Sequence, residues 1–314
     1  MNRRVTVLTG GVGGAKLVLG LTRVMPPDRI TAIINTGDDF RHLGLWVSPD
    51  IDTLLYTLSG RSNEERGWGR AGETWNFLEA LRSLGGEDWF ALGDGDLALH
   101  VQRTQRLAKG NTLSTVTDSF ARAWGLSTRF LPMSDDKVAT FVDTPEGELE
   151  FQRYFVARRC EPKATGIRFV GAPTAKPAPG VIDALTSAET SAILIAPSNP
   201  FLSVDPILAI PAISNALRTT KVPCIAVSPI VGGQAVKGPT VKLMNELGVA
   251  ITPAAIANHY DGIIDALLVD ERDKGVGPAL ALPHAYADTL MKTLADRERV
   301  ARAALALASE IARQ

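Results

Sequence analysis

The chain has few cysteines, and they are not arranged for cross-linking or zinc binding. Cys160 and Cys224 are its two cysteines, and neither belongs to a Cys-x-x-Cys pair or a Cys/His cluster. Disulfide frameworks and zinc sites need several such residues at short, defined spacings. We therefore expect the fold to depend on a hydrophobic core, which a chain of 314 residues is long enough to bury.

Long uninterrupted apolar runs are also missing. The run Val5–Leu8 meets glycines at once, so it is too short for the core of a signal peptide. No other stretch approaches the roughly 18 apolar residues that a membrane-spanning helix needs. We expect a cytoplasmic protein without a membrane partner.

Neither sign of charge is in excess. The 33 lysines and arginines are balanced by 34 aspartates and glutamates, which gives a formal net charge of -1 at pH 7. Proteins that capture nucleic acid over a broad surface carry a basic excess, so we expect no nucleic-acid partner. A local basic pocket for a phosphorylated small molecule remains compatible with this balance.

The first 35 residues have the pattern of a βαβ unit. The β-branched run Val5–Thr9 is followed by a glycine-rich loop and then by Leu17, Leu21 and Val24 at helical spacing. A second apolar run, Ile30–Ile34, follows Pro26-Pro27. Strand, glycine loop, helix and strand in this order predict a buried parallel sheet with a phosphate site at its carboxyl edge.

The same α/β alternation returns in the last third of the chain. The expected elements are strands at Ala192–Ala196, Cys224–Val227 and Ile263–Val269, a helix around Ile207–Leu217, and a closing amphipathic helix carrying Val300, Ala304, Leu307 and Ile311. We therefore predict a Rossmann-like, doubly wound and mostly parallel sheet built from residues 1–61 and 177–314.

Residues 62–176 have a different pattern of expected elements. Amphipathic segments are expected around Trp75–Leu84, Leu97–Leu107 and Thr117–Trp124, and a hairpin is expected from strands Val138–Val142 and Leu149–Phe155. We predict that this range forms an inserted α+β lobe that helps to cover the substrate site.

The glycine loop is suited to holding an oxyanion. Gly10, Gly11, Gly13 and Gly14 precede Lys16 where a strand hands over to a helix, so backbone amides and the helix dipole can face a phosphate. The alternative is a tight turn that needs positive φ angles. The loop is not a Walker A motif, because no Ser or Thr follows Lys16.

Four carboxylates follow the second strand. Asp38 and Asp39 come directly after it, and Asp50 and Asp52 follow about a dozen residues later, so all could meet at one sheet edge. Such oxygen ligands suit Mg²⁺ on a diphosphate, and a further carboxylate could accept a proton from a hydroxyl. The alternative for Asp50 or Asp52 is capping of a helix that begins near Thr53.

Two later segments carry further candidates. Ser198 and Asn199 lie in a proline-bounded loop after a buried strand and could donate to a phosphate or a guanine edge, although a plain β-to-α turn has the same composition. Lys237 adds a cation near Gly232. His100 and Arg103, at i and i+3, can face the same pocket, although a single helical histidine is more often packed in a core.

Several sequence blocks, taken together, resemble the 2-phospho-L-lactate transferase family. The blocks are NTGDD at 35–39, HLGLWVSPDIDTLLYTLSG at 42–60, WGRAGETW at 68–75, LGDGDLALH at 92–100, LPMSDD at 131–136, APSNP at 196–200, SPIVGG at 228–233 and KGPTVK at 237–242. They run through nearly the whole chain. The family's usual GDRD stands here as Gly93-Asp94-Gly95-Asp96, so one arginine is absent.

The resemblance implies an enzyme of coenzyme F420 biosynthesis. In such a reaction the ribityl hydroxyl of the deazaflavin 7,8-didemethyl-8-hydroxy-5-deazariboflavin attacks the phosphoryl group of a guanosine diphosphate-linked phospho-acid, and GMP leaves. The substrates are then small molecules, the cofactor is Mg²⁺ and the oligomer is a homodimer. The transferred acid stays open between phospholactate, phosphoenolpyruvate and phosphoglycerate.

The resemblance also implies residue roles. The residues implied in nucleotide and phosphate binding are Gly10, Gly11, Gly13, Gly14, Lys16, Asn35, Asp39, Ser198, Asn199, Pro200, Ser228, Gly232 and Lys237. Asp39, Asp50 and Asp52 are the implied metal ligands. Asp50 and Asp52 are the catalytic candidates, with Asp52 expected to contact the hydroxyl.

Two other functions are compatible with parts of the sequence. A sibling branch of the superfamily resembles a non-catalytic regulator that binds a sugar nucleotide, but the block SPDIDTLLYTL at 48–58 favours the transferase. A nicotinamide oxidoreductase is disfavoured because the second strand ends in Asn35-Thr36, without the acid that binds ribose in such enzymes.

Overall fold

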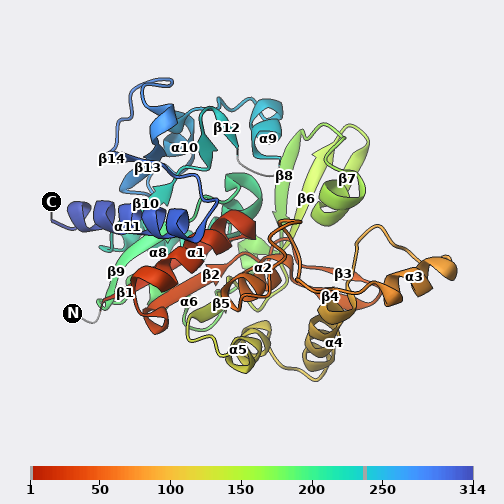
Figure 1. Cartoon of the computed structure of the whole chain (residues 1–314). Helices are drawn as coiled ribbons and strands as arrows, with labels where there is room; N and C mark the ends of the chain where they lie inside the picture. The colour runs from red at the N-terminus through yellow and green to blue at the C-terminus, as the bar shows by residue number, and fades with distance from the viewer. Residues whose placement is uncertain (1–2, 236–238, 314) are drawn as a thin grey trace.

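A seven-stranded sheet forms the centre of the molecule (Figure 1). The computed structural model describes residues 3–235 and 239–313. In spatial order the strands are β5 (Arg129–Pro132), β2 (Ile30–Ile34), β1 (Arg4–Thr9), β9 (Thr190–Ile195), β10 (Cys224–Val227), β13 (Ala266–Asp270) and β14 (His284–Ala287). Every neighbouring pair is parallel. This confirms the Rossmann-like expectation, with a sheet that is parallel throughout.

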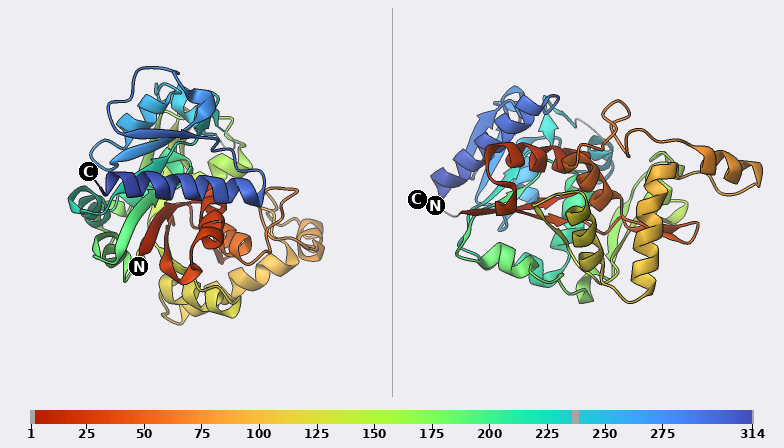
Figure 2. Two further views of the ribbon diagram at one scale, coloured as in Figure 1. Left: turned by 60° about the vertical axis from the view of Figure 1, so that its left-hand side comes forward. Right: turned by 60° about the horizontal axis from the view of Figure 1, so that its bottom comes forward.

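Helices cover both faces of the sheet. One face carries α1 (Gly11–Val24), α2 (Pro49–Leu58), α5 (Leu113–Ala123) and α11 (Leu294–Ile311). The other carries α6 (Val181–Thr186), α7 (Asp205–Leu208), α8 (Pro211–Thr219) and α10 (Pro253–His259). Alternate side chains of a strand enter the two cores: Val7 packs with the first set and Leu8 with the second. Figure 2 shows α11 packed against α1 on the same face of the sheet.

The strand order reverses between β1 and β9, so the connections that leave these two neighbours run in opposite directions. The chain continues from β1 toward β2 on one side, whereas β9 continues toward β10 on the other. A crevice opens at the carboxyl ends of such strands, and this is where ligands bind in open α/β sheets. The glycine loop after Thr9 and the loop after Ile195 therefore flank the expected site.

The lobe elements lie beyond one end of the sheet (Figures 1 and 2). They are the hairpin β3 (Phe40–His42) and β4 (Leu45–Val47), helices α3 (Asn76–Ser83) and α4 (Asp94–Ala108), and the antiparallel sheet β7 (Gly147–Glu150), β6 (Ala139–Thr144) and β8 (Gly166–Val170). Helix α3 projects outward from the body. The range 62–176 also supplies β5 to the central sheet, so the lobe does not coincide with that range.

Short elements complete the described chain. They are η1 (Pro27–Arg29), η2 (Arg153–Ala157), η3 (Ala172–Thr174), η4 (Pro200–Val204), η5 (Glu271–Asp273), β11 (Ile230–Val231), β12 (Gln234–Ala235) and α9 (Thr240–Glu246). No single described helix is long and apolar enough to cross a membrane; only η4 and α7 joined with α8 across an 87° bend reach that length and hydropathy.

Three local expectations were wrong. The strand expected at Leu149–Phe155 ends at Glu150, and the π-helix η2 follows, because Phe151 and Tyr154 are buried at helical spacing. The helix expected from about Thr53 begins at Pro49, so Asp50 and Asp52 lie inside its first turn and neither is its N-cap. The helix expected around 207–217 is interrupted, since Pro211 starts a separate helix.

Candidate functional site

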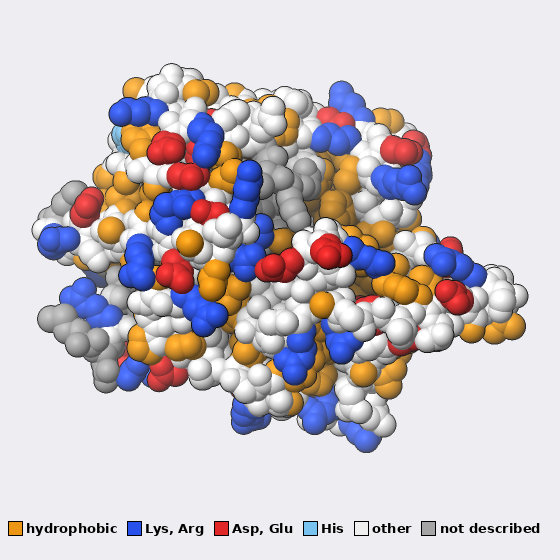
Figure 3. Space-filling model, in the orientation of Figure 1, with side chains coloured by type: hydrophobic (Ala, Val, Ile, Leu, Met, Phe, Trp, Pro, Cys, Tyr) orange, Lys and Arg blue, Asp and Glu red, His pale blue; other side chains and the backbone are white. Residues whose placement is uncertain are grey.

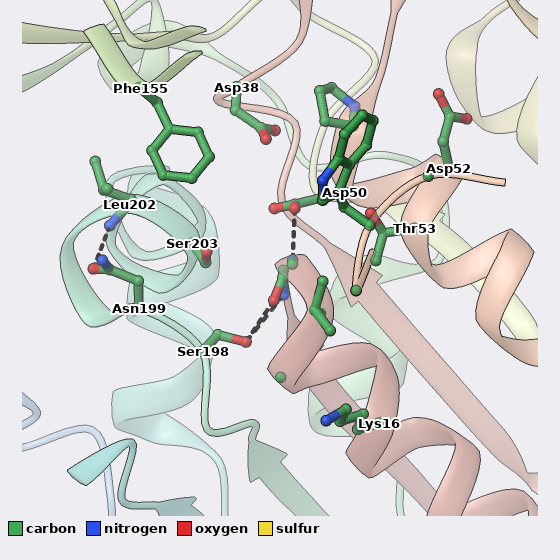
Figure 4. A pocket seen from close by; sticks show the side chains of 18 of the residues that line it. Lys16, Asp38, Asp50, Asp52, Thr53, Phe155, Ser198, Asn199, Leu202 and Ser203 are labelled. Carbon is green, nitrogen blue, oxygen red and sulfur yellow. Dashed lines mark hydrogen bonds between the residues drawn. The ribbon is translucent and has the colours of Figure 1, made fainter. Parts of the chain in front are cut away.

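A cavity of about 500 Å³ lies where the strand order reverses. The glycine loop, the loop after β9, and the segment after β10 form one part of its wall. Helices α2 and α4, the π-helix η2, the loop 66–69 and the segment around Phe90 form most of the rest. Figure 4 shows this cavity, with Asp38, Asp50 and Phe155 around one space and Ser198 and Lys16 farther along.

The glycine loop lies tightly against the loop after β9. Helix α1 starts at Gly11, whose φ of +61° favours glycine. A Cβ atom at Gly13 would lie 2.5 Å from the carbonyl oxygen of Pro197, so a side chain there would push the two loops apart. Ser198 Oγ donates to the Gly10 carbonyl at 2.6 Å. The two loops therefore form one wall, with the α1 N-terminus facing the cavity.

Asp50 connects the second strand region to this wall. Its Oδ1 accepts a hydrogen bond from the Gly11 amide at 2.5 Å, and its Oδ2 accepts one from Asn35 Nδ2 at 2.9 Å. The side chain is almost fully buried, which raises the pKa of Asp50 to about 6, although both hydrogen bonds oppose the rise. A carboxylate of this kind can accept a proton near neutral pH.

Asp38 and Asp50 line the same part of the cavity. Asn35 Nδ2 is within 3.4 Å of Asp38 Oδ1, and Gln152 Nε2 is within 3.4 Å of Asp38 Oδ2. Burial, followed by the charge of Asp50, raises the pKa of Asp38 well above its usual range. Asn35 is fully buried and does not line the cavity; its side chain donates to both acids from behind the wall. The sequence placed Asp38 near the edge but gave no reason to prefer it over Asp39.

Asp39 points away from the cavity. Its Oδ2 accepts from Ser48 Oγ at 2.6 Å and from Trp46 Nε1 at 3.1 Å, and it does not line the cavity wall. Burial raises the pKa of Asp39 to about 8, against the effect of the Ser48 hydrogen bond. This position does not suit the metal and nucleotide roles expected for Asp39.

Asp52 lines the cavity but is held by a buried cation. Both of its oxygens accept from the guanidinium of Arg103, one of them at 3.1 Å from Nη1, and Arg103 is fully buried. In Figure 4 its carboxylate points away from those of Asp38 and Asp50. Burial raises the pKa of Asp52 although Arg103 opposes it. Its pairing makes Asp52 a weaker candidate than Asp50 for contact with a reacting hydroxyl.

A polar network continues from Asp52 along the α4 side of the cavity. Arg103 Nη1 lies 3.3 Å from His100 Nδ1, and His100 Nε2 lies 3.2 Å from Asp96. Tyr56 Oη donates to Asp96. Because a guanidinium only donates, His100 Nδ1 is the acceptor in its contact with Arg103. His100 lines the cavity, whereas Arg103 is fully buried behind it, so the two residues share this network and not the cavity wall.

The remaining predicted site residues are placed as follows. Asn199 accepts through Oδ1 from the amides of Phe201 and Leu202, and thereby caps η4. Lys16 lines the cavity and donates to the Met291 carbonyl at 2.7 Å. Ser228 is buried in the wall.

Besides Asn35 and Asp39, three predicted residues do not line the cavity, and one is not described. Gly14 lies against Thr9 and Ser198. Pro200 is buried at the start of η4. The Gly232 amide donates to Asp273 at 3.0 Å, in a turn outside the wall. Lys237 lies outside the described residues.

Sequence reasoning missed the aromatic side of the cavity. Phe151 and Phe155 lie stacked, with ring centroids 5.4 Å apart, and Phe90 and Trp68 also line the wall. Phe155 and Trp68 are partly exposed although both are large and apolar. Their separation along the chain gave no spacing signal. This wall suits a flat, largely apolar ring system.

The residues described contain no group of three or more His, Cys, Asp or Glu that could hold a metal ion on its own. Asp38 and Asp50 nevertheless form a buried pair of like charges open to the cavity. Mg²⁺ often uses one or two protein carboxylates and completes its coordination with substrate phosphates and water. The pair therefore fits such an ion better than the expected set of Asp39, Asp50 and Asp52.

A glycine loop at a helix N-terminus, an acidic pair and an aromatic wall meet at the reversal of a parallel sheet. The fold and site thus define a Rossmann-like protein equipped to handle a phosphorylated ligand. Comparison with known families is more specific: residues 5–307 match the family described as 2-phospho-L-lactate transferase CofD. The chain belongs to the CofD family and is a transferase.

Individual relatives agree with this assignment. A protein of Streptomyces griseus named phosphoenolpyruvate transferase is 44% identical, over 98% of this chain and 99% of its own. One from Nocardia farcinica with the same name is 40% identical, over 88% and 87%. Among solved structures, a UPF0052 family member from Bacillus halodurans superposes with a TM-score of 0.63 at 17% identity, covering 96% of this chain and 98% of its own. That likeness supports the fold alone.

Proposed function

We propose that this protein transfers a phospho-acid from a guanosine diphosphate-linked donor to the ribityl hydroxyl of 7,8-didemethyl-8-hydroxy-5-deazariboflavin, releasing GMP, in coenzyme F420 biosynthesis. The names of the relatives at 40–44% identity favour phosphoenolpyruvate as the transferred acid. Phospholactate, named in the family description, and phosphoglycerate are the alternatives.

One observation carries the proposal: the buried acids Asp38 and Asp50 lie between the α1 N-terminus and the aromatic wall of a single cavity. A diphosphate suits the helix N-terminus, and a deazaflavin ring suits the aromatic side. The reacting hydroxyl and phosphorus would then meet beside the acids. No side chain has to form a covalent intermediate for such a transfer.

The proton of the attacking hydroxyl needs an acceptor. As the new O–P bond forms, the bond to the GMP oxygen breaks and GMP leaves with its electron pair. Asp50 is the proposed acceptor, because its pKa of about 6 is near neutrality and it is held by the Gly11 amide and Asn35. Asp52, our first choice from sequence, is instead proposed to stabilise Arg103 and the α4 side of the cavity.

Mg²⁺ is the proposed cofactor, with Asp38 as the protein carboxylate that would hold it beside Asp50, so that Asp50 keeps its role as the proton acceptor. When bound, it would neutralise charge on the diphosphate and on the leaving GMP. The repulsion between the two acids, which contributes to the raised pKa of Asp38, supports this assignment.

Binding of the deazaflavin alcohol to the purified protein tests the proposal. Deazaflavin fluorescence and heat of binding are to be followed with and without GDP and Mg²⁺. The deazaflavin is expected to bind saturably with micromolar affinity, and GDP is expected to change that affinity. Absence of deazaflavin binding together with binding of a uridine-linked sugar would replace the transferase with the sugar-nucleotide regulator.

A further inference from the structure

The loop Ser62–Arg70 carries a cation into the cavity wall that none of the roles above uses. It is closed by an antiparallel bridge between Ser62 and Arg70 and by the hydrogen bond from the Asn63 amide to the Gly69 carbonyl. Arg66, at its tip, lines the cavity together with Trp68. Its own amide donates to Asn63 Oδ1 at 2.9 Å, which fixes the backbone.

The Arg66 guanidinium is held by aromatic rings. It lies 4.8 Å from the ring centroid of Trp75 and 5.8 Å from that of Trp68. No carboxylate among residues 3–235 and 239–313 pairs with it. Aromatic stacking uses the faces of a guanidinium and leaves its in-plane N–H groups available, and these match a carboxylate in a bidentate geometry.

The charges of the cavity indicate which anion this cation serves. Among the described residues of the wall, Lys16 and Arg66 are the lysine and arginine side chains. Lys16 lies on α1 beside the glycine loop, the end that suits a diphosphate, and donates to Met291. Arg66 lies on a separate loop. Asp52 already pairs with Arg103, so Arg66 is not needed to balance it.

We propose that Arg66 binds the carboxylate of the phospho-acid, and so makes the site select phosphorylated carboxylic acids over other phosphate esters. The inference rests on the proposed function, in which the donor carries one carboxylate besides its diphosphate. All three candidate acids share that group, so Arg66 selects the class of acid and leaves the choice among them to other contacts.

Calorimetry with separate probes for the two anions tests this role. Phosphoenolpyruvate and ethyl phosphate, which lacks the carboxylate, are titrated into the protein with Mg²⁺ and saturating GMP; GDP is titrated separately. The unaltered protein is expected to prefer phosphoenolpyruvate. Arg66→Met should weaken phosphoenolpyruvate binding about 10- to 100-fold, the range for a lost charged hydrogen-bonded contact, and leave GDP unchanged.

Two further variants sharpen the comparison. Arg66→Lys keeps the charge but loses the planar fork, so its affinity for phosphoenolpyruvate should lie between those of the other two proteins. Arg41→Met is the matched control, because Arg41 is also exposed and stacked on a tryptophan, 5.7 Å from the Trp46 ring, but does not line the cavity. It should bind all three probes as the unaltered protein does.

Three results would overturn the inference: no preference for phosphoenolpyruvate in the unaltered protein, a preference that survives in Arg66→Met, or an equal loss of GDP binding in that variant. The last result would assign Arg66 to phosphate. Failure of the proposed function is a different outcome, in which the unaltered protein binds the probes with the expected preference but releases no GMP from any guanylated donor in the presence of the deazaflavin.

Discussion

Asp50, in the first turn of α2, accepts a 2.5 Å hydrogen bond from the amide of Gly11, the first residue of α1. An acid from one helix thus satisfies a backbone donor at the start of another, where the helix dipole favours negative charge. The same side chain faces the cavity. A phosphate that approaches this helix end therefore comes close to the proposed proton acceptor.

Replacing Asp50 by Asn should lower turnover by about 100-fold or more, because an amide cannot accept the hydroxyl proton. The amide oxygen can still accept from Gly11, but its NH2 group then faces the donor Asn35 Nδ2, so the variant should melt at a lower temperature and still fold. Steady-state kinetics and thermal melting check this, with Asp118→Asn, a change to an exposed acid of α5, as the control. Turnover within threefold of the unaltered protein in a folded D50N variant would remove the assigned role.

Replacing Asp52 by Asn should mainly destabilise the protein. The change leaves the fully buried Arg103 guanidinium without its carboxylate, which typically costs about 3–5 kcal/mol. The double variant Asp52→Leu/Arg103→Leu should recover much of that loss, as denaturant unfolding would measure. A D52N variant of unchanged stability but strongly reduced turnover would restore Asp52 as the group that contacts the hydroxyl.

Replacing Gly13 by Ala should weaken GDP binding. The added methyl group would meet the Pro197 carbonyl oxygen at 2.5 Å and separate the two loops that form the nucleotide wall. Gly85→Ala is the control, since its φ of +74° makes alanine costly while its surroundings are open. It should lose stability without losing GDP affinity. Equal GDP affinities for both variants would contradict the close packing of these loops.

Asp39 should make the metal-free protein less stable as the pH rises. In the folded protein the pKa of Asp39 is about 8, above the ordinary value of 3.8, so the folded state binds this proton more tightly than the unfolded state does. The resulting stabilisation is fully present below pH 3.8 and is lost as the pH rises through about 8. Between pH 5 and pH 9 the melting temperature of Asp39→Asn should therefore fall by less than that of the unaltered protein, with a difference of about 2 °C or more. Melting curves in the presence of a chelator check this, and parallel curves would contradict it.

Local sequence signals predicted five of the seven strands of the sheet, whereas the two edge strands β5 and β14 were not predicted. The runs Val5–Thr9 and Ile30–Ile34 are buried strands at the predicted positions, and Cys224–Val227 matches without a shift. The turn from Glu150 into η2 could not be predicted, since a short apolar run such as Leu149–Phe155 suits a strand or a helix equally well. Burial against the core decided it.

The site was less predictable than the sheet, because side-chain pairing depends on distant residues. Asp50 and Asp52 lie two residues apart in the same segment, and the sequence does not show that their partners differ. In the structure Asp52 pairs with Arg103 of α4, whereas Asp50 accepts from the Gly11 amide. Asp38 and Asp39 are adjacent, and Ser48 and Trp46 turn Asp39 away. Arg66 likewise gave no signal, because the rings that hold it are not part of any spacing pattern. The acidic segments after the second strand located the site at the sheet edge. Long-range packing determines which of their side chains face the cavity.

Release of GMP is the most direct test of the central claim. The purified protein is incubated with Mg²⁺, the deazaflavin alcohol and each guanylated acid in turn, and GMP and the phosphorylated deazaflavin are quantified by chromatography and mass. The account predicts both products in equal amounts, fastest with the phosphoenolpyruvate donor and strongly reduced in D50N. No deazaflavin product with any of the three donors, from a folded protein, would contradict it.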